Sequence, residues 1–389
     1  MAGSSDGSDG NIAKLAMLQS PLHMAFDSAG LLYFADKNNH RVCKISSNGK
    51  LIVIAGNGLE GYSGDSGLAV NSQLSHPSGI AIDSRGDIYV SDYGNSRIRK
   101  ITVKTGIITT IAGDEKPKSP QTQLLTTNNY GINSFPYTEL ASKYFSPSQA
   151  AKEESKIQSK IESKNEDKTD LGDNKHARYA KLDHPLGLAI DKHDNLYIAD
   201  KGNNRVRKIS ARTSIISTIA GGDTTVGFNK HFSGDGNLAI HAKLYFPSAV
   251  AVDKAGNVYI ADSGNNRIRM IDATSGIIDT VVGTTSGGFN DNKLAVEAKL
   301  RIPVGVHVDF DGNIFIADKG NNCIRKVTKS SGIISTIAGT GKAGINDDRA
   351  VSNPRSIMLS NPSAVVLDKH GNVYIADTNN HRIRRLNIK

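Results

Sequence analysis

An aspartate followed five residues later by an arginine recurs along this chain of 389 residues. The pairs are Asp36–Arg41, Asp92–Arg97, Asp200–Arg205, Asp262–Arg267 and Asp377–Arg382. A carboxylate beside a guanidinium could act in acid–base chemistry, or it could form a structural ion pair with two parallel hydrogen bonds. A catalytic group is expected once in a protein, whereas a structural group is expected in every repeat. We therefore interpret the five pairs as structural joints.

The copy of the motif in the fifth unit departs from this pattern, because Cys323 stands where an arginine would face Asp318. No other set of residues indicates an enzyme. The eleven histidines do not recur at one place in the repeat, as metal ligands from several units would. His23 occupies a position where other copies carry glycine, and we interpret it as a packing residue. We predict no catalytic residue, no metal and no cofactor.

The motif belongs to a unit of about 56 residues, and the six units predict a repeat architecture. Each unit has a leucine three residues before a proline, and the units begin near residues 18, 74, 182, 244, 300 and 359. In the second unit, residues 79–83, 88–92, 96–102 and 106–113 read as four short strands separated by glycine-containing turns. Four antiparallel strands in each of six units predict an all-β, six-bladed β-propeller.

The ends of the chain indicate how such a ring closes. The sixth unit stops after its third strand, and residues 10–17 resemble the missing fourth strand as it occurs at 332–338. We therefore predict that this N-terminal strand completes the last blade and leaves no open sheet edge. Residues 1–9 are predicted to be disordered, and residues 10–389 are assigned to the propeller.

The repeated residues resemble a known family. Pro-Ser-Gly-Ile-Ala-Ile-Asp at 77–83 and Ile-Ala-Asp-Lys-Gly-Asn-Asn-Arg at 198–205 are similar to the NHL repeat. The resemblance implies a six-bladed propeller that binds protein or RNA. One relative of the family, the peptidyl-hydroxyglycine amidating lyase, is a metal enzyme. Scarce cysteines and unpatterned histidines disfavour that activity here.

A binding surface is expected on the rim that carries the turn after each second strand. The residue after the conserved aspartate varies between units, and the six positions are Lys37, Tyr93, Lys201, Ser263, Lys319 and Thr378. Three aromatic residues of the linkers, Tyr62, Phe232 and Phe289, are expected on the same side. Lysines beside aromatic residues suit an acidic peptide or a nucleic-acid strand. We predict a non-enzymatic, monomeric scaffold for a protein partner, with RNA as the alternative ligand.

A further segment interrupts the repeat between the second and third units. Pro77 and Pro185 are 108 positions apart, whereas Pro21 and Pro77 are 56 apart. The interruption, assigned to residues 114–180, is charged and of low complexity, which is typical of a solvated segment. The chain has no apolar run long enough to span a membrane, and its two cysteines cannot form a disulfide framework. We expect an intracellular, cytoplasmic protein, or an extracellular one if the sequence is a fragment.

Overall fold

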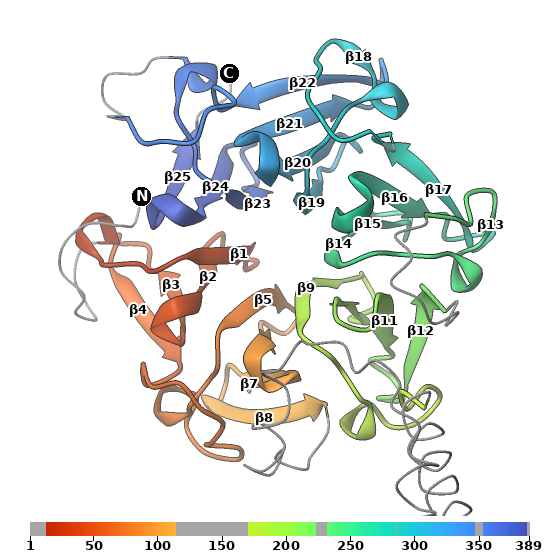
Figure 1. Cartoon of the computed structure of the whole chain (residues 1–389). Coiled ribbons are helices and arrows are strands. Elements are labelled where there is room, and N and C mark those ends of the chain that lie inside the picture. The colour runs from red at the N-terminus through yellow and green to blue at the C-terminus, as the bar shows by residue number, and fades with distance from the viewer. Residues whose placement is uncertain (1–12, 114–169, 223–231, 285, 347–352, 387–389) are drawn as a thin grey trace, which may run out of the picture.

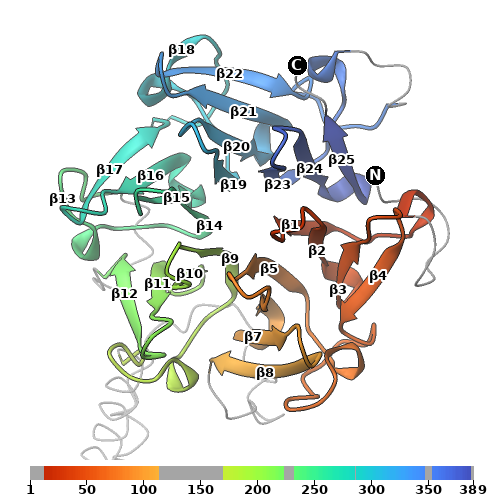
Figure 2. The same cartoon turned by 180° about the vertical axis from the view of Figure 1, so that it is seen from behind.

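The computed structural model describes residues 13–113, 170–222, 232–284, 286–346 and 353–386. Six antiparallel sheets surround a central axis, as Figure 1 shows, and Figure 2 shows the same ring from behind. In each sheet the strand that begins with the repeat proline lies at the axis, and the next two or three strands follow outward in sequence order. The prediction of an all-β, six-bladed propeller is confirmed.

The strands are short, as the period-two pattern of apolar residues predicts. From blade one to blade six they are β1 (Pro21–Phe26), β2 (Leu32–Asp36), β3 (Arg41–Ile45) and β4 (Leu51–Ala55); β5 (Pro77–Ile82), β6 (Ile88–Asp92), β7 (Arg97–Thr102) and β8 (Ile107–Ala112); β9 (Pro185–Ile190), β10 (Leu196–Asp200), β11 (Arg205–Ile209) and β12 (Ile216–Ala220); β14 (Pro247–Val252), β15 (Val258–Asp262), β16 (Arg267–Ile271) and β17 (Ile277–Val282); β19 (Pro303–Val308), β20 (Ile314–Asp318), β21 (Cys323–Thr328) and β22 (Ile333–Ala338); β23 (Pro362–Leu367), β24 (Val373–Asp377) and β25 (Arg382–Leu386).

Blades four and five each gain a short fifth strand from the preceding linker. These strands are β13 (Asn237–Leu238), which pairs with β17, and β18 (Lys293–Leu294), which pairs with β22. Blade six has three strands within the described residues. The blades therefore hold three to five strands, whereas four were predicted for each.

Short 3-10 helices occupy two recurring places. Those in the linkers are η1 (Ala13–Leu15), η3 (Ala69–Asn71), η5 (Ala177–Tyr179), η6 (Ala239–His241), η8 (Ala295–Glu297) and η10 (Pro354–Ser356). Those in the turn after the second strand are η2 (Lys37–Asn39), η4 (Tyr93–Asn95), η7 (Ser263–Asn265), η9 (Lys319–Asn321) and η11 (Thr378–Asn380).

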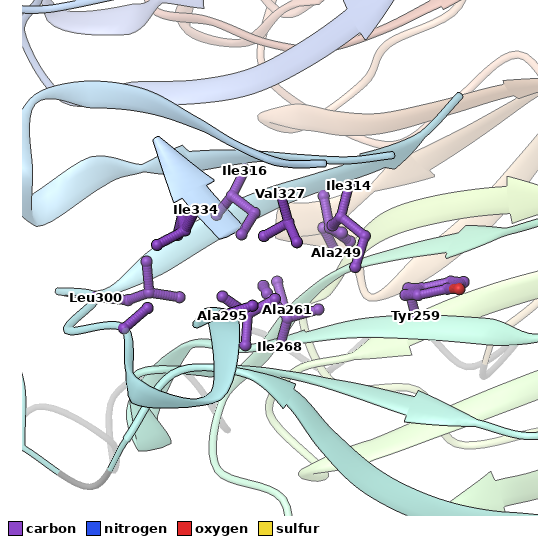
Figure 3. Close-up of a cluster of buried hydrophobic side chains, with 13 residues drawn as sticks. Ala249, Tyr259, Ala261, Ile268, Ala295, Leu300, Ile314, Ile316, Val327 and Ile334 are labelled. Carbon is purple, nitrogen blue, oxygen red and sulfur yellow. The ribbon is translucent and has the colours of Figure 1, made fainter. Parts of the chain in front are cut away.

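The hydrophobic core lies between neighbouring blades. In Figure 3, Ala261 and Ile268 of blade four face Ile316 of blade five, and Leu300 of the linker lies beside Ile334 at one end of the same cluster. All six repeat leucines are buried: Leu18, Leu74, Leu182, Leu244, Leu300 and Leu359. The linker leucine therefore fills the wedge between two twisted sheets, which explains why it recurs with the proline.

The predicted N-terminal strand is wrong for the residues that are described. Ala13–Leu15 form a 3-10 helix, and the Ala13 N–H donates to Gly49 O of blade one at 2.8 Å. The same bond joins Ala69 to Gly106 and Ala295 to Gly332. Residues 13–18 are thus the linker into blade one, and the resemblance to an outer strand was a misalignment. Residues 1–9 and 10–12 lie outside the described residues.

The ring closes through this linker. Ala13, Ala16 and Leu18 pack in one cluster with Ala364, Ala376 and Ile383 of blade six. Closure within the described chain is therefore an apolar contact between the first and last blades, and Figure 1 shows blade one (β1 to β4) beside blade six (β23 to β25).

The insertion predicted at 114–180 also extends too far. The Ala177 N–H donates to Ser214 O at 2.8 Å, as the equivalent linker alanines do in other blades. Residues 170–180 are therefore the linker into blade three. Residues 114–169 lie outside the described residues.

The closing contact can be tested with Leu18, which is 4 % exposed. Leu18→Ala should lower the free energy of unfolding by about 2–5 kcal/mol, because it leaves a cavity between blades one and six. Met17→Ala is the matched control: Met17 is 51 % exposed, and its loss should change the free energy by about 0.5 kcal/mol or less. Equal effects in urea denaturation would contradict this account of closure.

Candidate functional site

Each repeated aspartate is fully buried at the end of a second strand. In blade four, Asp262 Oδ1 accepts the Tyr245 N–H of the linker at 2.7 Å, and Oδ2 accepts Asn265 Nδ2 of the turn at 2.8 Å. Both bonds recur in all six blades at 2.7–2.8 Å. One carboxylate therefore fixes the linker and the turn to the strand. We call this arrangement, with its arginine, the joint.

The arginine of the joint is the second one of the motif in most blades, which corrects the predicted pairing. The ion pairs with the aspartate are Arg99–Asp92 at 3.3 Å, Arg207–Asp200 at 3.2 Å, Arg269–Asp262 at 3.7 Å, Arg325–Asp318 at 3.2 Å and Arg384–Asp377 at 2.7 Å. Of the predicted pairs, Arg41–Asp36 is a direct ion pair at 2.8 Å. Blade one carries Cys43 where the second arginine would stand, so its first arginine takes the role.

The first arginine lies beside the aspartate but serves the turn. Its backbone faces the aspartate across the two strands, as in Asp262 and Arg267. The Arg267 Nε donates to Asn265 O at 3.2 Å, and Arg205 makes the equivalent bond to Asn203 O at 3.0 Å. Blade five keeps the ion pair between Arg325 and Asp318 although Cys323 stands at the position of the first arginine. The joint of blade five therefore forms without a first arginine, whereas in blade one the first arginine replaces the second.

A second aspartate, from the linker, completes the joint in four blades. The pairs are Arg99–Asp65 at 2.7 Å, Arg207–Asp173 at 2.9 Å, Arg269–Asp235 at 2.6 Å and Arg325–Asp291 at 2.7 Å. All four arginines are fully buried, so each charge is balanced inside the protein. The role of these linker aspartates, among them Asp65 and Asp235, was missed from the sequence.

The linker aromatics predicted for the rim belong to the joints instead. The guanidinium of the joint arginine Arg269 lies 4.4 Å from the ring centre of Phe232, and that of Arg99 lies 4.9 Å from the ring centre of Tyr62. Phe289 covers Arg325 at 4.7 Å. A planar guanidinium stacks well on a ring, and the ring also shields the ion pair from water. These three residues therefore stabilise the fold and do not line the mouth of the channel.

Burial raises the pKa of the joint aspartates Asp92, Asp200, Asp262, Asp318 and Asp377 to about 6, against the lowering effect of their hydrogen bonds and arginines. A carboxylate held at 0 % exposure by an amide, a backbone N–H and a guanidinium has no free face for a substrate. The interpretation of the repeated acid and base as structural follows from this geometry.

The roles of the two arginines can be separated by substitution. Arg269→Ala leaves Asp262 and Asp235 without their shared cation and should lower the free energy of unfolding by about 3–5 kcal/mol. Arg267→Ala should have a clearly smaller effect, because blade five does without this arginine. Urea denaturation of both variants measures the difference, and a larger effect of Arg267→Ala would contradict the assignment.

Five of the six predicted rim residues line one pocket of about 440 Å³ at the mouth of the central channel. They are Lys37, Tyr93, Lys201, Ser263 and Lys319. The sixth, Thr378, is buried, and its hydroxyl donates to Pro21 O at 2.8 Å across the closing junction. We call the first five residues, together with Phe246, Ile302 and His23, the mouth pocket.

Phe246 and Ile302 were missed from the sequence. Each precedes a repeat proline and has a positive φ of 49°, as the residue before the proline does in every blade. In this conformation the side chain turns toward the mouth, where Phe246 is 41 % exposed and Ile302 is 48 % exposed. The sequence contains a signal that could have found them. The residue type before the proline varies between units as freely as the residue type after the aspartate, which was used to predict the rim.

The three lysines are brought together, as their place in alternate blades predicts. Lys37 Nζ and Lys201 Nζ lie 5.7 and 5.9 Å from the ring centre of Tyr93, and Lys201 Nζ lies 5.8 Å from that of Phe246. Burial, and then the charge of Lys319, lowers the pKa of Lys37. Burial lowers the pKa of Lys201, and Lys319 and Lys37 lower it further. No ion pair within the described residues engages these lysines.

His23 forms the floor of the mouth pocket, where it also borders the apolar channel beneath. It is 8 % exposed, and its Nε2 has no hydrogen-bond partner among the described residues. A Cβ on Gly187 would lie 3.0 Å from its Cε1, so the ring reaches the inner strand of blade three. The glycine makes room for this ring. His23 therefore packs across the channel, as predicted, and also presents a polar atom without a partner.

One other cluster has side chains that metals prefer. His40, Glu60 and His76 place their ligand atoms within 4.8 Å of one another at the junction of blades one and two. His40 Nδ1 accepts the His76 N–H at 3.3 Å, and Asn204, Asn266, Asn322 and His381 accept the equivalent N–H in other blades. This bond makes His40 part of a repeated inter-blade contact and favours the tautomer whose other nitrogen carries the proton. The cluster is therefore a poor metal centre.

The fold and the repeat agree with comparisons to known proteins. The model of the NHL repeat matches residues 74–101, 182–209 and 359–386, and the model of the teneurin NHL domain matches residues 212–290. The chain belongs to the NHL-repeat family. The resemblance stated from the motif is confirmed.

Relatives of this NHL propeller occur in larger proteins. It is 29 % identical over 351 residues to teneurin-4 of Mus musculus, covering 82 % of this chain and 11 % of the relative. It is 24 % identical to NHL repeat-containing protein 2 of Homo sapiens, covering 79 % of this chain and 46 % of the relative. It is 25 % identical to the chloroplastic protein SUPPRESSOR OF QUENCHING 1 of Arabidopsis thaliana, covering 83 % of this chain and 26 % of the relative. The NHL propeller thus spans less than half the length of these relatives.

Solved structures show the same fold. An auxiliary nutrient binding protein from Bacteroides thetaiotaomicron superposes with a TM-score of 0.63 at 14 % identity, covering 100 % of this chain and 75 % of that chain. A gluconolactonase from Xanthomonas campestris superposes with a TM-score of 0.50 at 11 % identity, covering 92 % of this chain and 83 % of that chain.

No helix in the described part of this NHL propeller is long and apolar enough to cross a membrane.

Burial lowers the pKa of His23 to about 4, which makes a prediction for acid stability. Because the unfolded chain protonates His23 first, its contribution to the free energy of unfolding is present above pH 6.5 and is lost as the pH falls toward 4. The loss is at most about 1.4 kcal/mol per pH unit. His23→Gln should remove this pH-dependent loss of the free energy of unfolding, whereas His193→Gln, at an exposed histidine, should leave it unchanged. Urea denaturation of the native protein and both variants between pH 7 and pH 4 tests this prediction. If the free energy of unfolding falls with pH equally in all three, the burial of His23 is contradicted.

Proposed function

We propose that this NHL propeller is a non-enzymatic binding platform that captures an acidic segment of a partner protein on the face of its mouth pocket. The observation that carries the proposal is the gathering of Lys37, Lys201 and Lys319 around one opening without an ion-pair partner in the described chain. Three neighbouring cations raise the local potential, so an acidic segment is attracted from a distance and its association accelerates.

The surface around the lysines has the composition of a protein-binding site. Phe246 and Ile302 are large and exposed beside the charges, and Tyr93 lies between Lys37 and Lys201. Apolar side chains supply buried area on docking, while the lysines supply orientation. RNA remains the alternative ligand, since aromatic rings and lysines also hold a single strand. The apolar lining of the channel and the bonded carboxylates of the joints offer no acid–base pair in support of an enzyme.

The platform is tested with charge reversal. Lys37, Lys201 and Lys319 are changed together to Glu, and the control changes Lys104, Lys192 and Lys369, which are exposed in turns at the opposite end of the strands. The probes are a fluorescent oligoglutamate peptide and a single-stranded RNA of equal charge. We expect the native protein to bind the peptide, the mouth variant to lose most of this binding through slower association, and the control to keep it.

Two results would contradict the proposal. If both triple variants lose peptide binding equally, the overall charge explains it and the mouth pocket has no special role. If the RNA binds more tightly than the peptide, with a steep dependence on salt and a loss confined to the mouth variant, the protein is an RNA-binding propeller.

A further inference from the structure

Three features outside the joints have unused polar or apolar surface. The His40, Glu60 and His76 cluster is committed to an inter-blade contact, as described above. The lower channel, of about 360 Å³, is lined mainly by Val, Ile and Ala side chains with His307 among them, and nothing in it selects a ligand. The mouth pocket alone combines charge, enclosure and a polar atom without a partner.

We propose that the mouth pocket is also a receptor for a small polyanion, a ligand carrying two or three carboxylate or phosphate groups. The inference rests on the cationic mouth used in the proposed function, but it requires no protein partner. It assigns a ligand class to the pocket itself, whereas the platform concerns the surface around it.

The number of charges indicates more than one anionic group. Lys37, Lys201 and Lys319 come from blades one, three and five and so approach the pocket from three sides. A single carboxylate has two oxygens and reaches one or two ammonium groups, whereas a ligand with several oxyanion groups can meet all three. Holding like charges partly buried together is unfavourable, and a bound polyanion removes that repulsion.

The floor of the pocket supplies a neutral hydrogen-bond donor. His23 Nε2 is buried without a partner among the described residues, and a buried polar atom in this state carries an energetic cost that a ligand can relieve. Because Nε2 is itself buried, the ring has to turn about its Cβ–Cγ bond before an N–H on Nε2 can donate to an anionic oxygen in the pocket. The hydroxyl of Ser263, in contrast, already donates to the backbone of blade five. His23 is therefore the polar group at the floor that remains for a ligand.

The enclosure limits the size of the ligand. The ring of His23 reaches Gly187 and separates the mouth pocket from the lower channel. A ligand therefore sits in about 440 Å³ above this floor, with Tyr93 and Phe246 at its sides. This volume suits a compact molecule, such as a tricarboxylic acid or a diphosphate, and not the threading of a long chain.

The test is isothermal titration calorimetry on the purified protein, with no partner added. Citrate represents carboxylates, pyrophosphate represents phosphates, and acetate at matched ionic strength is the monoanion control. We expect one site per chain for citrate or pyrophosphate, and the stronger of the two identifies the chemistry. Acetate should bind at least about 10-fold more weakly, because one charged contact is worth about one decade or more.

Variants locate the site. Lys201→Gln should weaken polyanion binding about 10-fold or more, whereas Lys192→Gln, in an exposed turn at the other end of blade three, should leave it unchanged. His23→Ala should weaken it several-fold, and His23→Gln should restore part of it through its amide N–H. Circular dichroism checks that each variant is folded. If the His23 variants are unstable, the comparison of Lys201→Gln with Lys192→Gln alone decides whether the polyanion binds in the mouth pocket.

Three outcomes would overturn the inference: no heat above the acetate control, several sites per chain, or equal weakening by Lys201→Gln and Lys192→Gln. The platform is judged apart from it. Polyanion binding without oligoglutamate binding supports the receptor and contradicts the platform, and oligoglutamate binding without polyanion binding does the reverse.

Discussion

The buried aspartate of the joint is the interaction on which the rest of this propeller depends. One carboxylate accepts from the linker backbone, from the asparagine of the turn and from a buried arginine, so it ties three segments of a blade together. The residue that follows it in sequence is the rim residue of that blade, Lys201 after Asp200 or Lys319 after Asp318. The structural acid therefore positions the functional cation, and the six repetitions bring five such positions to one opening.

The structural role of the joint and the binding role of the rim explain why the repeat is uniform at some positions and variable at others. The aspartate, the asparagine and the arginine have partners that every blade supplies, so a change at any of them leaves a buried polar group unsatisfied. The residues after the aspartate and before the proline are not part of the joint, and they reach the opening only where their side chains line the mouth pocket, as those of Lys37, Lys201 and Phe246 do. Variation at these two positions gives the mouth pocket its three lysines and two aromatic rings, and His23, two residues after its repeat proline, adds the histidine.

Much of this arrangement was accessible from the sequence, because the repeat carries its own alignment. The leucine–proline spacing located the blades, and the convergence of Lys37, Lys201 and Lys319 followed from closure of the ring. The N-terminal strand failed because alternating apolar residues at 10–17 resemble an outer strand, whereas the alanines that match the linkers fix the true alignment. The first arginine was predicted as the partner because it follows the aspartate by five residues across a turn, but the ion pair is made by the second arginine, two residues further along the third strand. Tyr62, Phe232 and Phe289 were misplaced because side-chain direction in a long linker is set by tertiary contact, which spacing does not encode.

The central claim is that the ring gathers three lysines into one electrostatic site. Side-chain NMR titration of Lys37 and Lys201, in the native protein and in Lys319→Gln, measures this most directly. The account predicts that both lysines titrate below their usual pKa, and that removing Lys319 raises both pKa values, because its charge contributes to both shifts. Values at the ordinary pKa of lysine, unchanged by Lys319→Gln, would show that the three ammonium groups do not share a site and would contradict the account.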